Sequence, residues 1–438
     1  MAETVSAGAG QFPRQRTVAL IVLVILAVYG IEAHARSYEK STPATLGDQS
    51  AYLGYARHLY ESHYTVTEDR NRMPVYPFLL SLIYRPGMTE DEFLLRAQSF
   101  TVNLSILLLL LLFFIFRNVF PPLPAIALLA ATAFGVFIYR AGKAQVEVVF
   151  YFVSFCAFAL LLQMFIKPRW WIAILAGATT GLAHLTKASV LPVLAIWAVV
   201  FGAQILWSFR AQPWRRLGML ALVLAGFLAV IFPYIRTSKR IYDSYFYNVN
   251  STFVMWCDSS TEAYEFLSAH GDKDQWRALP PEQLPSFRKY WREHSVAQIA
   301  RRIWKGARDL TTKNLRAIAY YKFVLVLLVA AVVLCLWDWR KARAVFAQDP
   351  FAAIFCLLFL AGYYVLYAWY DQIINDARFV LSIFLPFVLA ASLFVLRVGR
   401  DRVFPLGGRR IPFEQFFAAL FLGLAVIDVV YNATGLAR

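Results

Sequence analysis

A chain of 438 residues in which 60% of the side chains are hydrophobic is too apolar for an ordinary soluble domain. Its formal net charge of +16 is compatible with nucleic-acid binding, but the basic residues are spread over the connections between apolar runs, as in membrane proteins. Composition therefore argues against a soluble enzyme and a nucleic-acid partner. Three of the four cysteines lie within apolar runs, which argues against a disulfide framework.

Apolar runs of about 20 residues, which cross about 30 Å of hydrocarbon as a helix, recur along the whole chain. Lipid offers no partner to backbone groups, so these runs are expected to be helices. We predict one all-α polytopic membrane domain over residues 1–438, with about eleven spans. In chain order these are 17–35, 93–116, 121–139, 145–166, 170–189, 191–209, 216–235, 317–337, 351–370, 378–397 and 412–431.

The orientation of these spans follows from Lys and Arg, which concentrate in cytoplasmic connections. The first run lacks a clear small-residue cleavage site, so we expect a retained span rather than a signal peptide. With the N-terminus in the cytoplasm, two long segments, 36–92 and 236–316, lie outside a membrane that we expect to be a bacterial inner membrane. The N-terminal tail and the cytoplasmic connections then contain sixteen Lys and Arg residues. The outer short turns have only Arg140, Lys143, Lys187 and Arg378.

The first outer segment contains GDQSAYLGYARHLYESHY, whose apolar residues fall at helical spacing. This pattern predicts a helix lying flat on the membrane surface. Asp48 opens the helix, either as an N-cap or as a carboxylate that takes a proton from an acceptor or binds a divalent cation. The two roles are compatible. Tyr52 lies on the apolar stripe, and Tyr76 follows in the stiff stretch PVYP.

Several ionisable residues lie inside or at the ends of predicted spans, where a charge is costly without a partner or a cavity. Glu147 is either paired with Lys143, four residues earlier, or part of a polar site. Lys187 either extends its ammonium group to the membrane surface or binds phosphate. His184, one turn deeper, is more typical of a packing residue than of a ligand. Asp428, in the last span, has no partner that the sequence identifies.

The orientation places five charged residues together on the outer face, although each alone is compatible with a plain surface charge. An acid with several cations beside lipid fits a substrate whose phosphate lies at headgroup level and whose tail stays in the bilayer. Motifs such as G-x-S-x-G or the Walker A loop are absent from the sequence, so a nucleotide-activated donor is not expected. The five residues are Asp48, Arg72, Glu147, Lys187 and Arg378.

Three segments make the sequence resemble the GT-C superfamily of membrane glycosyltransferases. These enzymes use sugars carried on polyprenyl phosphates and include protein O-mannosyltransferases and lipid A aminoarabinose transferases. The first segment, residues 47–84, has an acid, an aromatic-rich helix and an Arg-x-Pro-x-Tyr-Pro-like element. The other two are AGATTGLAHLTKASVLP and NDARFVLSIFLPFVL. Their order and spacing extend the resemblance over nearly the whole chain.

The resemblance implies that Asp48 is the catalytic carboxylate of the first loop, which activates the acceptor or helps to bind a metal. It also implies that Arg378 and Lys187 bind the donor phosphate, and we add Arg72 as a third phosphate ligand. The residues that we expect to line the substrate pocket are Glu147, His184, Tyr52 and Tyr76.

Two departures from the family pattern matter. Many relatives have two adjacent acids where this chain has Asp48 followed by Gln49, which weakens the case for a metal. If a divalent cation such as Mg²⁺ or Mn²⁺ is used, Asp48 and Glu147 are its expected ligands. The soluble C-terminal domain of some relatives is missing, so the membrane domain and the 236–316 segment are expected to recognise the acceptor.

The sequence therefore predicts a hexosyl- or pentosyltransferase that moves a sugar from a polyprenyl-phosphate donor to a glycan, lipid or protein acceptor on the non-cytoplasmic side. By resemblance to the family, a single displacement would invert the anomeric centre. Two other classes stay open, a transporter or lipid flippase and a non-catalytic membrane scaffold. Transporters usually place charges near the bilayer midplane and often have inverted repeats. Here the charges lie at one face and no repeat is visible, which favours the enzyme.

Overall fold

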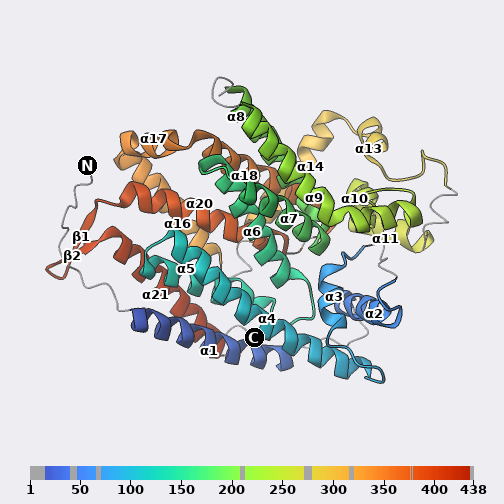
Figure 1. The fold of residues 1–438 in the computed structure, drawn as a ribbon, viewed down its shortest axis with the longest axis horizontal. Helices are drawn as coiled ribbons and strands as arrows, with labels where there is room; N and C mark the ends of the chain where they lie inside the picture. Colours follow the sequence, from blue (N-terminus) through green and yellow to red (C-terminus); the bar gives the residue numbers. More distant parts are fainter. Residues whose placement is uncertain are drawn as a thin grey trace.

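The computed structural model shows an elongated bundle of helices (Figure 1). It describes residues 15–39, 47–65, 71–207, 213–270, 279–314, 320–374, 376 and 378–434.

Helices account for almost all of the regular structure, and η marks a short 3₁₀ or π-helical turn. The first half of the chain forms α1 (Gln15–Glu39), α2 (Gly47–Glu61), α3 (Val75–Ser81), α4 (Glu90–Val119), α5 (Pro122–Gly135), η1 (Phe137–Tyr139), α6 (Glu147–Ile166), α7 (Trp170–Thr186), η2 (Ala188–Val190), α8 (Leu191–Trp207) and α9 (Pro213–Tyr242). The second half forms α10 (Val249–Thr252), η3 (Val254–Trp256), α11 (Ser260–Ala269), α13 (Phe287–Glu293), α14 (Val296–Asp309), η4 (Leu310–Asn314), α16 (Tyr321–Trp337), α17 (Trp339–Gln348), α18 (Pro350–Tyr370), α19 (Arg378–Leu381), α20 (Phe384–Gly399), β1 (Val403–Leu406), β2 (Arg409–Pro412) and α21 (Phe413–Ala433).

Helices long and apolar enough to cross a membrane dominate the described residues. Eight pass this test: α1, α4, α5 with η1, α6, η2 with α8, α9, α18 and α21. The pair α16 and α17, bent by 112°, makes a ninth if it is one span. The predicted all-α membrane fold is thereby confirmed, and the protein is an integral membrane protein. The predicted count of eleven spans is not confirmed, because α7 and α20 are only 17 and 16 residues long.

Two of the predicted spans are interrupted near charged residues. α7 ends at Thr186, and Lys187 after it has extended backbone with φ −156° and ψ 130°. α19 and α20 are separated at Ser382, whose carbonyl would accept a helical hydrogen bond from residue 386. Pro386 has no N–H to donate, so a continuous helix is not formed there.

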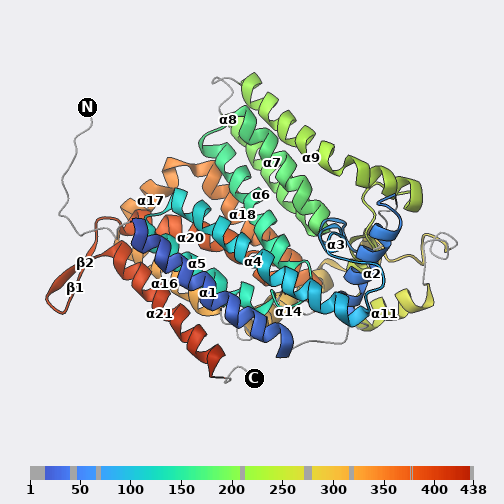
Figure 2. The same cartoon turned by 60° about the horizontal axis from the view of Figure 1, so that its bottom comes forward.

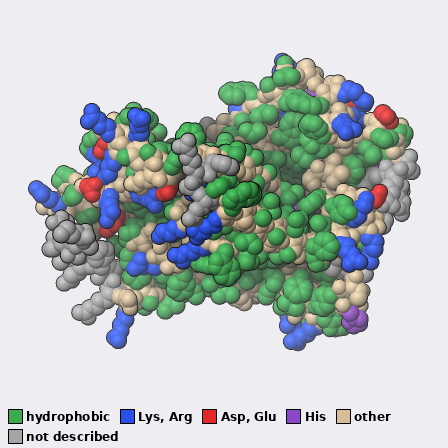
Figure 3. Space-filling model, turned by 45° about the horizontal axis from the view of Figure 1, so that its top comes forward, with side chains coloured by type: hydrophobic (Ala, Val, Ile, Leu, Met, Phe, Trp, Pro, Cys, Tyr) green, Lys and Arg blue, Asp and Glu red, His purple; other side chains and the backbone are tan. Residues whose placement is uncertain are grey.

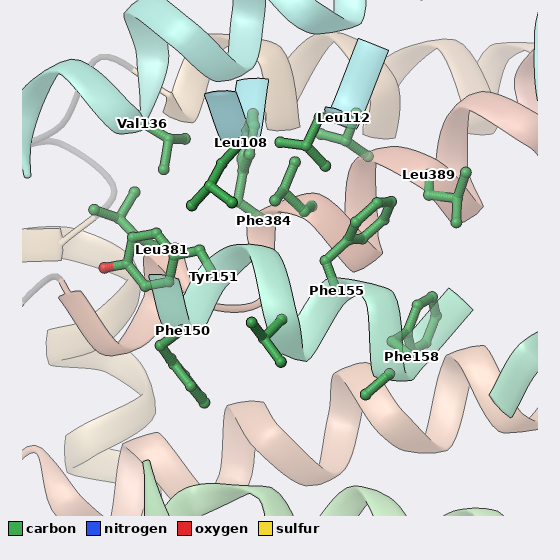
Figure 4. Packing of buried hydrophobic residues seen from close by; sticks show 14 of the residues in the cluster. Leu108, Leu112, Val136, Phe150, Tyr151, Phe155, Phe158, Leu381, Phe384 and Leu389 are labelled. Atoms are coloured by element: carbon green, nitrogen blue, oxygen red, sulfur yellow. The ribbon is translucent and has the colours of Figure 1, made fainter. Parts of the chain in front are cut away.

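The centre of the bundle is formed by α5 and α6. Of the residues in the α5 span, Pro122–Tyr139, 83% are buried inside the protein. In Figure 4, Tyr151, Phe155 and Phe158 of α6 lie among Leu108 of α4 and Leu389 of α20, so these helices share one core. The core holds the first turn of α6, and with it Glu147, in a fixed position.

Small residues let helices approach closely, as is common between membrane-spanning helices. A Cβ atom added at Gly177 of α7 would lie 2.1 Å from the carbonyl oxygen of Val223 in α9. Only glycine therefore fits at this crossing of α7 and α9, and a larger side chain would force the two helices apart.

Short elements lie at the two ends of the bundle. One end has α2, α3, α10 and α11, and the other has α17 and the β1–β2 hairpin (Figure 1 and Figure 2). Lys and Arg side chains gather toward both ends, with mostly hydrophobic side chains between them (Figure 3). This distribution fits a protein whose middle is surrounded by lipid.

The hairpin at one end was not predicted from the sequence. β1 and β2 pair antiparallel, and the two residues between them, Gly407 and Gly408, both have positive φ, at 55° and 77°. A two-residue turn with positive φ at both positions is typical of tight hairpins, and Gly-Gly permits it. The dipeptide was therefore a signal for this hairpin.

The two long segments predicted outside form short helices at the other end. A helix, α2, is present in the first segment where one was predicted, and the second segment forms α10, η3, α11, α13 and α14. Residues 271–278 of this segment lie outside the described residues. α14 begins with a capping box between Ser295 and Gln298 and packs closely on α18, since a Cβ at Gly306 would lie 1.8 Å from the carbonyl oxygen of Ala368.

Candidate functional site

Asp48 lies in the first turn of α2, which packs against α3. Leu53 and Ala56 of α2 are fully buried, and the ring of Tyr52 meets the ring of Tyr76 edge-on at 5.3 Å between centroids. This packing fixes the start of α2. The Asp48 carboxylate is thereby held at the end of the bundle that contains α2, α3, α10 and α11.

Two arginines hold the Asp48 carboxylate. Arg72 donates to Oδ1 and Arg378 donates to Oδ2. The N-cap role considered from the sequence is thus corrected, because both oxygens bind arginines from other elements. Burial disfavours the charged carboxylate, but the attraction of Arg378 and Arg72 outweighs this, so the pKa of Asp48 lies below its usual value.

Arg378 contacts three carboxylates. Besides Asp48, its Nε lies 3.3 Å from Asp376 Oδ2 and its Nη1 lies 3.6 Å from Glu147 Oε1. Its backbone is held as well: its N–H donates to Asp376 at 2.8 Å, and the Tyr151 hydroxyl donates to its carbonyl at 2.8 Å. A guanidinium fixed in this way presents its donors in a set direction, which suits recognition of a phosphate.

Glu147 opens α6 and is only 2% exposed. Its Oε1 lies 3.6 Å from Lys187 Nζ, and its Oε2 has no hydrogen-bond partner among the described residues. The alternative pairing with Lys143 is not the one observed. α6 begins at Glu147, so no helical turn brings residue 143 alongside it.

Lys187 points into the protein rather than to the membrane surface. Its Nζ lies 5.4 Å from the ring centroid of Phe150 and 5.0 Å from that of Phe379. The ammonium group therefore lies between two aromatic rings and the Glu147 carboxylate. Partial removal from water strengthens the attraction of such a group for an anion.

Arg140 and Asp376 extend this arrangement. Arg140 Nη2 lies 3.0 Å from Asp376 Oδ1. Burial opposes ionisation of Asp376, but the backbone N–H of Arg378 and the charge of Arg140 outweigh it and lower the pKa of Asp376. Ion pairs thus join four cations and three carboxylates, which together have a net positive charge and favour an anionic ligand. We call them the Asp48 cluster: Asp48, Arg72, Arg140, Glu147, Lys187, Asp376 and Arg378.

The Asp48 cluster lies at helix ends. Glu147 opens α6, Lys187 follows α7 and Arg378 opens α19. α6 has 20 residues and is therefore about 30 Å long, so its other end lies a membrane thickness away. The cluster is thus near one edge of the apolar belt and not at its middle.

The structure brings together all five charged residues that the sequence singled out. The other three candidates, Tyr52, Tyr76 and His184, do not take part in these ion pairs. Tyr52 borders the Asp48 cluster, with its ring centroid 5.8 Å from Arg72 Cζ. Tyr76 lies deeper and shares a hydrogen bond of 2.7 Å with Thr101. His184 packs its ring 6.0 Å from Phe227 and 6.0 Å from Phe246, neither of which belongs to the cluster.

Three residues of this region were not predicted as site residues. Arg140 and Asp376 lie in short turns beside predicted candidates, and that position was the available signal. Gln49 is 2% exposed, and its side-chain oxygen accepts the backbone N–H of Ala144 at 2.9 Å. It therefore ties α2 to the turn before α6, which positions Asp48 relative to Glu147.

The residues considered for a divalent cation do not fit one in this arrangement. Asp48 and Glu147 both face Arg378, whose guanidinium lies where a bridging cation would have to be. Among the residues that the structure describes, no group of three His, Cys, Asp or Glu is placed to hold a metal.

Comparison with known proteins finds a likeness among solved structures. No family model matches the chain, and no curated protein sequence matches it. The crystal structure of ArnT from Cupriavidus metallidurans bound to undecaprenyl phosphate is similar to this chain, with a TM-score of 0.48 and 16% sequence identity. The match covers 96% of this chain and 71% of that ArnT chain.

Proposed function

We propose that the protein is a membrane glycosyltransferase that moves a sugar from a polyprenyl-phosphate donor to an acceptor on the non-cytoplasmic side of a bacterial inner membrane. The observation that supports this is the Asp48 cluster, in which a carboxylate lies beside a surplus of positive charge at the ends of spanning helices. A polyprenyl-linked sugar would present its phosphate at this depth and keep its tail in lipid.

The positive charge suits the leaving group of this reaction. The donor is a phosphodiester with one negative charge, and the departing polyprenyl phosphate gains a second as the bond to the sugar breaks. Cations fixed at that position stabilise the transition state more than the bound donor. In the proposal, Arg378 and Lys187 bind this phosphate, and Arg72 assists.

Asp48 would act as the base. While Arg72 and Arg378 hold its two oxygens, it is a poor proton acceptor, because the charged form is strongly favoured. A donor phosphate competes for the same guanidinium groups, and its binding would release the carboxylate. We therefore expect the donor to bind before the acceptor.

The proposed transfer is a single displacement. The acceptor oxygen or nitrogen attacks the anomeric carbon, the bond from that carbon to the phosphate oxygen breaks, and Asp48 takes the acceptor proton. The anomeric centre is inverted, and polyprenyl phosphate leaves. Glu147 would hold Lys187 and Arg378 in position, and the segments 36–92 and 236–316 would cover the acceptor.

The alternative of a transporter or lipid flippase is less well supported. Such proteins usually bind their substrate near the bilayer midplane, whereas the Asp48 cluster lies at helix ends. A non-catalytic scaffold would not need a carboxylate and several cations held together in a partly buried group. The position and the charge of the cluster therefore favour a transferase.

The test is turnover by the purified full-length protein in lipid vesicles. A panel of short-chain polyprenyl-phosphate hexoses and pentoses, labelled in the sugar, is supplied with a mixture of glycan, lipid and peptide acceptors. We expect one donor to yield labelled product together with free polyprenyl phosphate. Asp48→Asn is expected to reduce this turnover by at least about 10³-fold, because the general base is removed.

A matched variant controls for the loss of one acidic side chain. Asp91→Asn makes the same change at an exposed residue in the first turn of α4, outside the Asp48 cluster, and should keep wild-type turnover. Wild-type turnover by Asp48→Asn would contradict the proposed base. Movement of labelled lipid across the vesicle membrane without any covalent product would instead support a flippase.

A further inference from the structure

A second basic site lies at the other end of α7, where α7 and α9 begin. A cavity of about 550 Å³ opens there, within the range of about 300–1,000 Å³ that is usual for ligand sites. Arg169 and Arg215 line it on the polar side, and Met219 and Leu222 line it on the apolar side. The cavity therefore combines a cationic rim with an apolar wall.

Three tryptophans complete the lining. Trp170 and Trp171 open α7, and Trp214 lies at the start of α9. Trp170 and Trp214 are 64% and 79% exposed, which is expected for side chains that reach the lipid headgroup layer. An aromatic and basic lining at this depth is suited to a molecule with both a polar head and an apolar tail.

The charge of the cavity selects among such molecules. The described residues that line it include Arg169 and Arg215 and no Asp or Glu, and the first turns of α7 and α9 contain no acid. A zwitterionic lipid would bring its own cation into this positive region. A lipid with a net negative headgroup is better matched, and basic pockets between spanning helices are known to bind such headgroups.

The cavity is separate from the Asp48 cluster. α7 has 17 residues and is about 25 Å long, with the cavity at its start and Lys187 just after its end. The two sites therefore face opposite leaflets of the membrane. An occupant of the cavity is a lipid of the leaflet opposite to the proposed catalytic site.

We propose that this cavity binds an anionic phospholipid, with the phosphate held by Arg169 and Arg215 and an acyl chain against Met219 and Leu222. A lipid bound here would contact both α7 and α9, whose crossing tolerates only glycine at Gly177. It would stabilise the packing of α9 against α7, the helix that Lys187 follows. This inference does not depend on the proposed transfer reaction.

The test is a titration of the purified full-length protein in detergent with dioleoyl phosphatidylglycerol and, separately, with dioleoyl phosphatidylcholine, read by native mass spectrometry. We expect the first phosphatidylglycerol to bind more tightly than phosphatidylcholine by about tenfold or more, since each nearby basic residue contributes to attraction of an anionic lipid. The double variant Arg169→Gln/Arg215→Gln should lose this preference. Equal affinity for both lipids in the wild type would overturn the proposal.

Two further variants separate the cavity from general surface charge. Arg340→Gln/Arg343→Gln removes two exposed arginines beside the exposed Trp339 on α17, outside the cavity, and should leave the preference unchanged. Gly218→Trp keeps both cavity arginines but fills the space. The site of its Cβ has no atom within 4 Å, so the fold should tolerate it.

Gly218→Trp is therefore expected to weaken phosphatidylglycerol binding by about tenfold while thermal unfolding stays at the wild-type temperature. Unchanged binding by this variant would show that the lipid lies elsewhere. Soluble glycerol 1-phosphate is added as a competitor. Displacement of the lipid at equal concentration would contradict the role given to Met219 and Leu222.

Discussion

The Asp48 cluster and the pair Lys322–Asp428 are two partly buried groups of charges that differ in composition. Lys322 at the start of α16 donates to Asp428 near the end of α21, and Asp428 is 2% exposed. This pair has one cation and one carboxylate. The Asp48 cluster has four cations and three carboxylates from several elements.

The difference separates a structural role from a binding role. A balanced pair has no net charge that would attract an ion, so its expected effect is to join α16 to α21. An unbalanced cluster keeps a net charge that an anion can neutralise. Surplus charge, rather than burial, is the property that indicates a site here, and it can be tested by changing the charges of each group separately.

The largest effect is expected on stability, from breaking the balanced pair. Lys322→Met leaves the Asp428 carboxylate buried without its cation, which should lower the free energy of unfolding by about 3–5 kcal/mol. The measurement is thermal or denaturant unfolding in detergent. Lys322→Met/Asp428→Leu should recover most of the loss, and both variants should keep wild-type turnover per folded molecule. Reduced turnover by the stable double variant would place the pair in the functional site.

The next effect concerns turnover by the Asp48 cluster. Arg378→Gln removes the cation that contacts three carboxylates and that is assigned to the leaving phosphate. The rate should fall by about 10²–10³-fold, the usual loss when one donor to a developing negative charge is removed. Arg378→Lys should recover only part of it, because lysine lacks the planar set of donors. Steady-state kinetics that left both variants at the wild-type rate would remove Arg378 from the mechanism.

A smaller effect is expected on binding of the product, polyprenyl phosphate. Here the substitution should strengthen binding. Glu147→Gln removes one carboxylate beside Lys187 and Arg378 and raises the net charge of the Asp48 cluster. A short-chain polyprenyl phosphate should then bind about fivefold more tightly, since one unit charge a few ångströms away contributes about 1 kcal/mol. The measurement is a binding titration with the purified protein. Weaker binding would contradict this prediction and mean that the positioning of Lys187 and Arg378 by Glu147 outweighs the effect of its negative charge.

The smallest effect is a change of stability with pH. The pKa of Asp48 is below its usual value in the folded protein, so its ion pairs stabilise the fold above the unfolded pKa of about 4. This contribution is lost as the pH falls through the folded pKa. The Tm difference between wild type and Asp48→Asn should therefore shrink on acidification below about pH 4. A difference that stayed constant from pH 7 to pH 3 would mean that Asp48 is not held as a carboxylate.

Apolar runs were sufficient to predict most of the bundle. The runs behind α1, α4 and α21 are long, so a shift of several residues at either end does not change their identity as spans. The count of spans was less predictable, because it depends on local breaks. The extended backbone of Lys187 and the missing N–H of Pro386 shorten two predicted spans, and hydropathy does not register either feature.

The sequence was a better guide to which residues belong to the Asp48 cluster than to which of them form ion pairs with one another. Glu147, Lys187 and Arg378 share one end of the bundle because successive spans run in alternating directions and each of the three lies at a helix end. The ion pairs that form depend on the positions of the side chains. Separation along the sequence does not give these positions. Glu147 binds residues far along the chain rather than Lys143, and Asp428 pairs with a lysine 106 residues away.

The contact between Asp48 and Arg378 joins residues 330 positions apart, while Arg72 is only 24 positions from Asp48. At about 5–20 residues per second, the ribosome makes Arg378 on the order of tens of seconds after Asp48. During that interval Arg72 is the one cation of the Asp48 cluster already made that contacts Asp48. Chains that stop before α19 would therefore leave Asp48 with Arg72 as its one arginine partner, so the Asp48 cluster is completed only after most of the chain has been made.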